Sequence, residues 1–131
     1  MPNETERAAV RYVEGWAKRR GIRTAKAKKG SGYDRLFTLP NGRKQKIEIK
    51  GSATDEGLPD MPTSEFRKKH LIADFVHFVT NVRATRKKHY IIPRAEFKPE
   101  DLYPKHTYHI NMGQKRLDRY RVKRKRESAS Q

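Results

Sequence analysis

The sequence predicts one α/β domain, and three observations support this prediction. A length of 131 residues suits one domain with a single core of modest size. Helical and strand-like apolar patterns alternate along the chain, in the order helix, strand, hairpin, helix, strand. Apolar residues make up 34% of the composition and include aromatic and β-branched runs, which is lean for a core but argues against a disordered chain.

The chain is expected to open with a helix. Asn3 can cap a helix that extends from about Glu4 to Arg20 and stops at Gly21. At about 100° per residue, Glu6 points along the inner face of this helix. Two interpretations remain open: Glu6 bonds back to Asn3 in a capping box, or it takes part in a metal site. The apolar stripe of the helix consists of Ala9, Val10, Val13, Trp16 and Ala17.

A predicted β-hairpin follows. A strand at 22–28 and the basic loop Lys29-Gly30-Ser31-Gly32 lead into it. Residues 35–39 and 43–47 carry apolar side chains on either side of Pro40-Asn41-Gly42. In that segment proline presets the turn and glycine can adopt a positive φ, so a tight connection between two strands is expected.

The hairpin sets the register of three charged residues. If Leu39 faces Arg43 across the turn, Asp34 lies opposite Glu48. Lys50 then lies on the same face as Glu48, because side chains of a strand alternate with period two. Two acids directly across a ladder repel each other, and a bound divalent cation would remove that cost. Two carboxylates and one amine on a strand pair are the groups that a metal-dependent phosphodiesterase needs.

The apolar pattern and the turn residues in the second half of the chain predict further elements of the same domain. A polar loop precedes a short helix at 64–71. The strongest strand pattern is at 73–79, and a partner strand at 88–92 is ended by Pro93. A turn around 99–102 and a strand at 107–110 complete the prediction.

The charge indicates a polyanionic partner, and nucleic acid is the leading candidate. The chain has 32 Lys and Arg against 15 Asp and Glu, a net charge of +17. Residues 115–131 hold eight basic and two acidic residues, which leaves +11 on the rest. We therefore expect a domain at 1–114 and a basic extension at 115–131 whose end is disordered. The side chains expected to contact nucleic acid are Lys29, Ser31, Arg83, Arg86, Lys87, Lys88, Lys115, Arg116, Arg119, Arg121, Lys123 and Arg124.

Composition also excludes some classes of protein. The chain has no cysteine, which excludes a disulfide framework and a thiolate zinc site and favours an intracellular, cytoplasmic protein. No apolar stretch approaches the length of a membrane span or of a signal sequence. We therefore expect no membrane partner.

Three stretches together resemble the PD-(D/E)XK nuclease superfamily. They are Glu6-Arg7 on the first helix, Gly32-Tyr33-Asp34, and Ile47-Glu48-Ile49-Lys50-Gly51. Within the superfamily the chain looks most like the small Holliday-junction resolvases and the Mrr-type restriction endonucleases, over roughly residues 4–80. Tyr33 stands where the family often has proline, at a position that carries no ligand. The resemblance implies a restriction-endonuclease-like domain with a central mixed β-sheet flanked by helices, and it is compatible with a homodimer that cuts both DNA strands.

The resemblance also implies a role for each residue, with Glu6, Asp34, Glu48 and Lys50 as the catalytic set. Asp34, Glu48 and the Ile49 carbonyl would hold Mg²⁺ or Mn²⁺, and Glu6 would join directly or through a water. The ion would act as a Lewis acid and activate the attacking water. Lys50 would orient that water or stabilise the charge that develops on the phosphate. The predicted function is a Mg²⁺-dependent deoxyribonuclease, with branched or otherwise structured DNA as a candidate substrate.

Two other functions fit the same sequence. The first is a non-catalytic nucleic-acid-binding protein that retains the nuclease fold and its charge. The second is a basic structural protein of a ribonucleoprotein, which would prefer RNA and have no metal site. A structural alternative also stays open for Asp34 and Glu48, in which they lie on an exposed face and pair with neighbouring lysines such as Lys46. Lys50 could likewise have only a surface role.

Other motifs are given a structural interpretation. Glu96-Phe97-Lys98 repeats the Glu-x-Lys pattern by chance, because Pro99 follows it and no aspartate-bearing strand precedes it. His106-x-x-His109 lacks further ligands with the spacing of a zinc site. His77 is expected at the edge of the core or on the surface. Tyr90, Tyr103 and Tyr108 could stack on bases, but packing is favoured.

Overall fold

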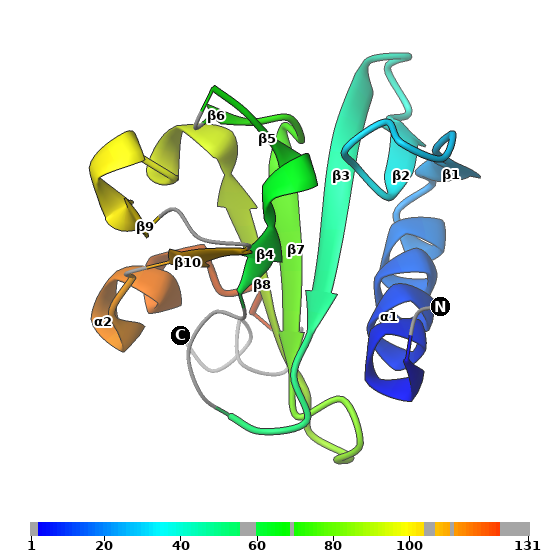
Figure 1. Ribbon diagram of the computed structural model, residues 1–131. Helices are drawn as coiled ribbons and strands as arrows, with labels where there is room; N and C mark the ends of the chain where they lie inside the picture. Colours follow the sequence, from blue (N-terminus) through cyan, green and yellow to red (C-terminus); the bar gives the residue numbers. More distant parts are fainter. Residues whose placement is uncertain (1–2, 56–59, 69, 104–106, 111, 124–131) are drawn as a thin grey trace.

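A mixed five-stranded sheet forms the centre of the protein (Figure 1). The computed structural model describes residues 3–55, 60–68, 70–103, 107–110 and 112–123. Only the central pair, β3 and β7, is parallel, and the other neighbours in this sheet are antiparallel. The predicted single α/β domain with a mixed sheet is therefore confirmed. In spatial order the strands are β1 (Arg23–Lys26), β2 (Arg35–Thr38), β3 (Lys44–Gly51), β7 (Phe75–Thr80) and β8 (Lys88–Pro93).

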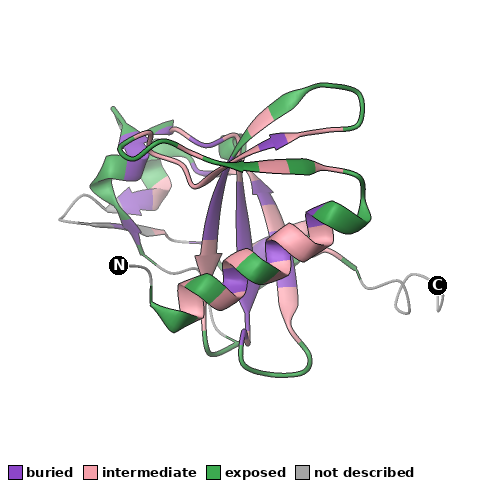
Figure 2. Cartoon of the chain, turned by 90° about the vertical axis from the view of Figure 1, so that its right-hand side faces the viewer, coloured by how far each residue is buried: buried purple, intermediate pink, exposed green. Residues whose placement is uncertain are grey.

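The helix α1 (Glu4–Arg19) covers one face of this sheet, as Figures 1 and 2 show. The Asn3 side chain accepts a hydrogen bond from the Glu6 N–H at 2.8 Å, and Gly21 follows the helix with a φ of 71°. The predicted cap, helix and stop are thus confirmed. The buried residues of the predicted stripe, Ala9, Val13 and Ala17, pack in one cluster with Phe37, Ile47, Ile49 and Val79.

Smaller elements cover the opposite face of the sheet (Figure 1). They include a three-stranded sheet of β4 (Met61–Pro62), β10 (Thr107–Ile110) and β9 (Leu102–Tyr103), and the short helix α2 (Gln114–Leu117). A second core lies between these elements and the inner residues of β7 and β8. In the part of the chain that is described, no helix is long and apolar enough to cross a membrane. The described 3₁₀ turns are η1 (Thr63–Glu65), η2 (Arg94–Glu96), η3 (Pro99–Asp101) and η4 (Asp118–Tyr120).

The prediction of a helix at 64–71 is wrong. The segment instead forms η1 and a two-stranded ribbon of β5 (Phe66–Arg67) and β6 (His70–Leu71), in which Phe66 pairs with Leu71. Both of these side chains are buried in the second core. Lys68 has a φ of 49°, a left-handed conformation that no α-helix contains. Burial of the two apolar ends on the same core therefore outweighs the helical propensity of the charged residues between them.

The predicted register of the β2–β3 hairpin is confirmed. The Leu39 N–H donates to the Arg43 carbonyl at 2.8 Å, and Gly42 takes the expected positive φ of 88°. The ladder continues from there to the pair of Arg35 and Ile47. Asp34 and Glu48 come directly after this last pair, so the turn does bring the two acids together.

His77 lies neither at the edge of the core nor on the surface, in contrast to the prediction, because β7 is an inner strand of a sheet covered on both faces. It is 2% exposed, and its Nδ1 lies 2.8 Å from Nε2 of His89, which is equally buried on β8. The indole of Trp16 on α1 lies against both imidazoles, at ring-centre distances of 5.2 and 5.3 Å. Tyr90 is fully buried, so the prediction that it packs rather than stacks on bases is confirmed for this residue.

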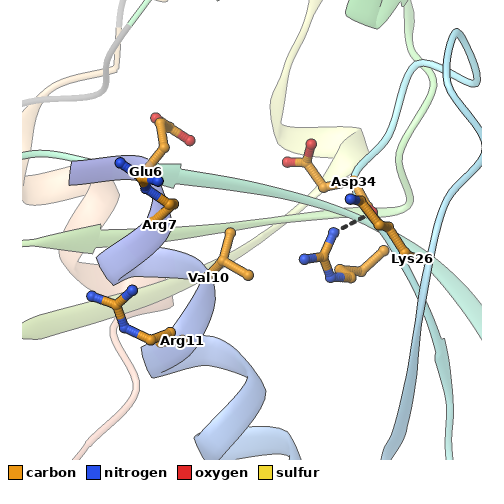
Figure 3. A pocket seen from close by; sticks show the side chains of 7 residues that line it. Glu6, Arg7, Val10, Arg11, Lys26 and Asp34 are labelled. Atoms are coloured by element: carbon orange, nitrogen blue, oxygen red, sulfur yellow. Dashed lines mark hydrogen bonds between the residues drawn. The ribbon is translucent and has the colours of Figure 1, made fainter. Parts of the chain in front are cut away.

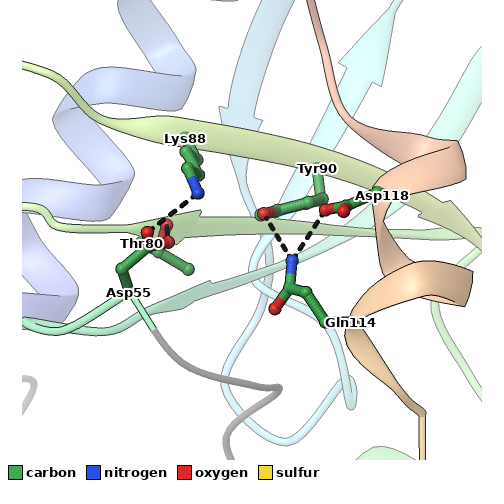
Figure 4. A network of polar contacts seen from close by, with 6 residues as sticks. All are labelled: Asp55, Thr80, Lys88, Tyr90, Gln114 and Asp118. Carbon is green, nitrogen blue, oxygen red and sulfur yellow. Dashed lines mark hydrogen bonds and ion pairs between the residues drawn. The ribbon is translucent and has the colours of Figure 1, made fainter.

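The first part of the basic C-terminal segment packs on β8. Leu117 is 1% exposed, and the Val122 N–H donates to the His89 carbonyl. The Gln114 side-chain amide donates to the Tyr90 hydroxyl at 3.2 Å and to the Asp118 carboxylate at 2.7 Å (Figure 4). These contacts attach residues 114–122 to the domain.

Candidate active site

Asp34 and Glu48 meet where the β2–β3 ladder ends. The Asp34 N–H donates to the Ile47 carbonyl at 2.9 Å, and its Oδ2 accepts from the Ile49 N–H at 2.8 Å. The carboxylate thus takes the place of a ladder partner for Ile49. Glu48 is only 2% exposed and forms a side-chain hydrogen bond with Asp34. The alternative in which both acids lie on an exposed face beside Lys46 is therefore wrong for Glu48.

Lys50 lies on the Glu48 face of β3, as predicted, and pairs with a residue that the sequence did not indicate. Its Nζ is 2.8 Å from Oε1 of Glu65, at the end of η1. The two side chains are 13% and 12% exposed. The other oxygen of Glu65 is buried and has no hydrogen-bond partner. A neutral Glu48 could donate a proton to this oxygen, whereas an ionised Glu48 could not.

Glu6 reaches the same end of β3 from α1. Its Oε1 accepts from the Gly51 N–H at 3.4 Å, so the carboxylate turns toward the sheet rather than back to Asn3. Close contact between the helix and β3 needs the glycine, because a Cβ at Gly51 would lie 2.7 Å from that of Ala9. Of the two interpretations left open, the site role fits this orientation better than a reciprocal capping box.

Burial strongly perturbs the titration of these groups. It raises the pKa of Glu48 to about 11, assisted by the hydrogen bond with Asp34 and by the charges of Asp34 and Glu65. Burial likewise raises the pKa of Glu6 and of Glu65, and the nearby Lys50 ammonium opposes this in both. Burial alone would lower the pKa of Lys50, but the charges of Glu65 and Glu48 outweigh it and raise that pKa. The carboxyl groups of Glu6, Glu48 and Glu65 thus all lie near one positive charge, the Lys50 ammonium.

This donor set fits a hard divalent cation. The adjoining carboxyl oxygens of Asp34 and Glu48 favour Mg²⁺ or Mn²⁺ over softer metals. Among the described residues, no group of three or more His, Cys, Asp or Glu side chains forms a complete metal site. Mg²⁺ commonly takes one or two carboxylates and completes its shell with waters and substrate phosphates. Asp34 and Glu48 with the Ile49 carbonyl would therefore be a sufficient protein contribution.

A basic pocket opens onto the carboxylates. Its volume is about 450 Å³, and Glu6 and Asp34 both line it. Figure 3 shows Glu6, Arg7 and Arg11 projecting from α1 on one side of the opening, with Lys26 and Asp34 on the other. Arg35 also lines this pocket and donates to the Asp34 carbonyl at 3.0 Å. A phosphate that entered here would meet guanidinium and ammonium groups beside the carboxylates.

The basic lining of this pocket continues across the loop Lys29-Gly30-Ser31-Gly32. Lys29 and Ser31, two predicted nucleic-acid contacts, line a second pocket that shares Lys26, Asp34 and Arg35 with the first. Ser31 also lines a third pocket with Lys46, Arg67, Lys68, His70 and Arg94. The loop is held in place because Gly32 packs on Ile72, where a Cβ would come within 2.3 Å of that side chain. The three openings therefore adjoin one another along one basic surface.

Other predicted contacts lie elsewhere, and some are paired within the protein. Lys88 binds Asp55 at 2.8 Å (Figure 4), and Arg116 binds Glu96 at 2.9 Å and Asp101 at 3.1 Å. Arg83, Arg86 and Lys87 lie in the turn after β7. Lys115, Arg119, Arg121 and Lys123 lie on or after α2, and Arg124 is outside the described residues.

Sequence reasoning missed Glu65 and the cations of the first pocket. Glu65 comes from a segment that was expected to be helical, 15 residues after Lys50, and no local spacing links the two. Nothing in the composition singles out Arg7, Arg11, Lys26 and Arg35, because the chain contains many other basic residues. For the first two, spacing by four on one helix was the available signal.

Comparison of the chain with known protein families, with curated proteins and with solved structures finds no match.

Within the chain, the second Glu-x-Lys triplet, Glu96-Phe97-Lys98, differs clearly from the first, Glu48-Ile49-Lys50. Phe97 is buried, Glu96 is bound by Arg116, and Lys98 is exposed. The pair His106 and His109 cannot be compared, because His106 and the His109 side chain lie outside what the structure describes.

Proposed function

We propose that the protein is a metal-dependent endonuclease that hydrolyses phosphodiester bonds in DNA. The observation that carries the proposal is the junction of Asp34, Glu48 and Lys50 at one end of the β2–β3 ladder, with Glu6 reaching the same strand. Two buried carboxyl groups in contact cannot both ionise at low cost unless a cation shares them. The resemblance to PD-(D/E)XK nucleases supports the same assignment, and a homodimer is part of it because two cuts need two sites.

The side chains would divide the chemistry between them. Asp34, Glu48 and the Ile49 carbonyl would hold Mg²⁺ or Mn²⁺, which when bound supplies Lewis acidity and lowers the pKa of a bound water. Lys50 would face the scissile phosphate as a preorganised cation. Glu6 would accept hydrogen bonds from water at the open side of the site. Arg7, Arg11 and Lys26 would hold the phosphates beside the scissile one.

The test is a cleavage panel. Supercoiled plasmid, linear duplex, branched DNA, single-stranded DNA and RNA are incubated with the purified protein, with and without Mg²⁺. Metal-dependent cutting of at least one DNA substrate is expected. Binding without cutting under all conditions would favour the non-catalytic alternative, and a preference for RNA without cutting would favour a ribonucleoprotein component.

Lys50→Ala should lower kcat by about 10²- to 10³-fold while the affinity for metal changes little, because the amine stabilises the transition state rather than the ion. Lys98→Ala is the matched control: it changes the lysine of the second triplet, and its rate should equal wild type. Both rates are measured at saturating DNA and Mg²⁺. Equal losses in the two variants would mean that these lysines serve only general attraction to DNA.

The C-terminal cations are expected to bind phosphates away from the cleavage site. Truncation after Gly113 would remove the buried Leu117, so replacing the exposed Lys115 and Arg119 by glutamine is the cleaner change. Each lost contact should reduce the slope of log affinity against log salt by about 0.9 on duplex DNA. Cutting at saturating substrate should persist. Salt titrations with unchanged slopes would show that these side chains do not touch DNA.

A further inference from the structure

Glu65 forms the most buried ion pair that the structure describes. Its partner is Lys50, at 2.8 Å, and the two side chains are 12% and 13% exposed. Every other described pair has at least one side chain that is 28% exposed or more. The pair also joins distant parts of the chain, β3 and the end of η1.

This arrangement is unfavourable as a device for stability alone. A buried ion pair must recover the desolvation of both charges, and an apolar pair of similar volume is often as stable. The second oxygen of Glu65 is also buried, and a protonated Glu48 could bond to it. The contact is better explained by what it does to Lys50.

A lysine needs such a partner to act at a fixed point. Its ammonium ends a flexible four-carbon chain, whereas a reacting group must be held to within about 0.5 Å. Glu65 Oε1 occupies one of the three N–H groups of Lys50 and leaves two for other acceptors at the site. The Lys50 ammonium therefore stays charged and is held in one position.

The segment that carries Glu65 is itself anchored beside the carboxylates. The Ile72 N–H donates to the Glu65 carbonyl at 3.0 Å, which ties η1 to the chain that follows β6. Ile72 and the Ser64 carbonyl in turn contact Gly32, two residues before Asp34. The segment from Ser64 to Ile72 therefore contacts both Lys50 and the loop that carries Asp34.

We propose that Glu65 is a positioning residue, which holds the Lys50 ammonium against the scissile phosphate from a separate element of the fold. This inference rests on the proposed nuclease function and assigns a residue that the sequence motif does not contain. Glu65 acts through Lys50 and not on the substrate, so its contribution exists only while Lys50 is present.

The experiment is a double-mutant cycle on plasmid cleavage in Mg²⁺, with Glu65→Ala, Glu65→Gln and Lys50→Ala and the two double variants. Glu65→Ala should lower kcat by about 10²-fold with KM unchanged, the cost typical of a misplaced group. Glu65→Gln keeps an oxygen acceptor of the same shape and should recover part of that loss. In the Lys50→Ala background neither change should lower kcat further. Glu96→Gln, which alters the carboxylate of the Arg116 pair, is the control and should cut at the wild-type rate.

Thermal unfolding of each variant separates positioning from folding, and the Glu65→Gln rates test the inference if Glu65→Ala does not fold. Wild-type kcat in Glu65→Ala, or in Glu65→Gln where the alanine variant does not fold, would overturn the inference while leaving the nuclease proposal in place. An equal further loss in the Lys50→Ala background would also overturn it, since the residue would then act independently of Lys50. A wild-type protein that cuts none of the substrates would overturn the nuclease proposal and the inference together.

Discussion

Replacing Asp34 by asparagine, or Glu48 by glutamine, should abolish Mg²⁺-dependent cleavage while DNA binding stays close to wild type. Each amide keeps the shape of the side chain but removes the charge that the ion would need. Asparagine also retains an oxygen for the Ile49 N–H, so the end of the hairpin should remain intact. We expect a loss of at least about 10³-fold in kcat. Glu100→Gln, an exposed acid outside the site, is the matched control and should cut normally.

The same substitutions should not destabilise the metal-free protein. Glu48 is neutral at pH 7 without a cation, because its pKa is raised to about 11, and glutamine resembles that neutral form. The free energy of unfolding in EDTA should therefore change by less than about 1 kcal/mol, because an amide can keep the hydrogen bond between the two side chains. Denaturant titration measures this. A variant that cuts at the wild-type rate would remove the catalytic assignment, and one that unfolds would show that the carboxylate serves the core instead.

The hairpin is the part of the site that could be predicted, because its rules are local. A turn with Pro40 and Gly42 fixes the pairing of its strands, and period two then decides which side chains share a face. Asp34, Glu48 and Lys50 were therefore brought together from the sequence alone. Glu6 followed from the helical period in the same way.

Glu65 could not be predicted, because its place depends on tertiary contacts. The segment that carries it turns back at Lys68 and buries Phe66 against Leu71, and neither event leaves a periodic signal. His77 was misjudged for a related reason. A polar residue within an alternating strand indicates the edge of the core or the surface when one face of the sheet is assumed to be solvated, whereas β7 is covered on both faces.

The second large expected effect is a loss of folding stability at acid pH, caused by the buried His77 and His89. Burial lowers the pKa of His77 well below its usual range, and the charge of His89 adds to this. Burial also lowers the pKa of His89, to about 3, and nearby Arg20 contributes. The rings touch at 2.8 Å through one shared hydrogen, and the aromatic rings of Tyr12, Trp16 and Phe37 lie against the pair. Two protonated rings would point N–H groups at each other with no acceptor between them.

The sign of the effect follows from linkage. Below about pH 6.5 the unfolded chain protonates both imidazoles and the folded chain does not, so stability falls as pH falls. Each histidine should cost about 1.4 kcal/mol per pH unit until its folded pKa is reached. Glu48 acts in the opposite direction, because its raised pKa makes the folded state bind the extra proton above about pH 4.5. The wild-type profile alone therefore mixes the two contributions.

Comparison with a double variant, His77→Leu with His89→Leu, isolates the histidines. The difference in unfolding free energy between wild type and variant should change by up to about 2.8 kcal/mol per pH unit between pH 6 and 4, to the disadvantage of wild type. Urea titrations at several pH values in that range measure it. His70→Leu replaces an exposed histidine and should leave the wild-type profile unchanged. Parallel profiles for wild type and the double variant would mean that the pair takes up a proton within the folded protein, which its contact at 2.8 Å and its aromatic surroundings oppose.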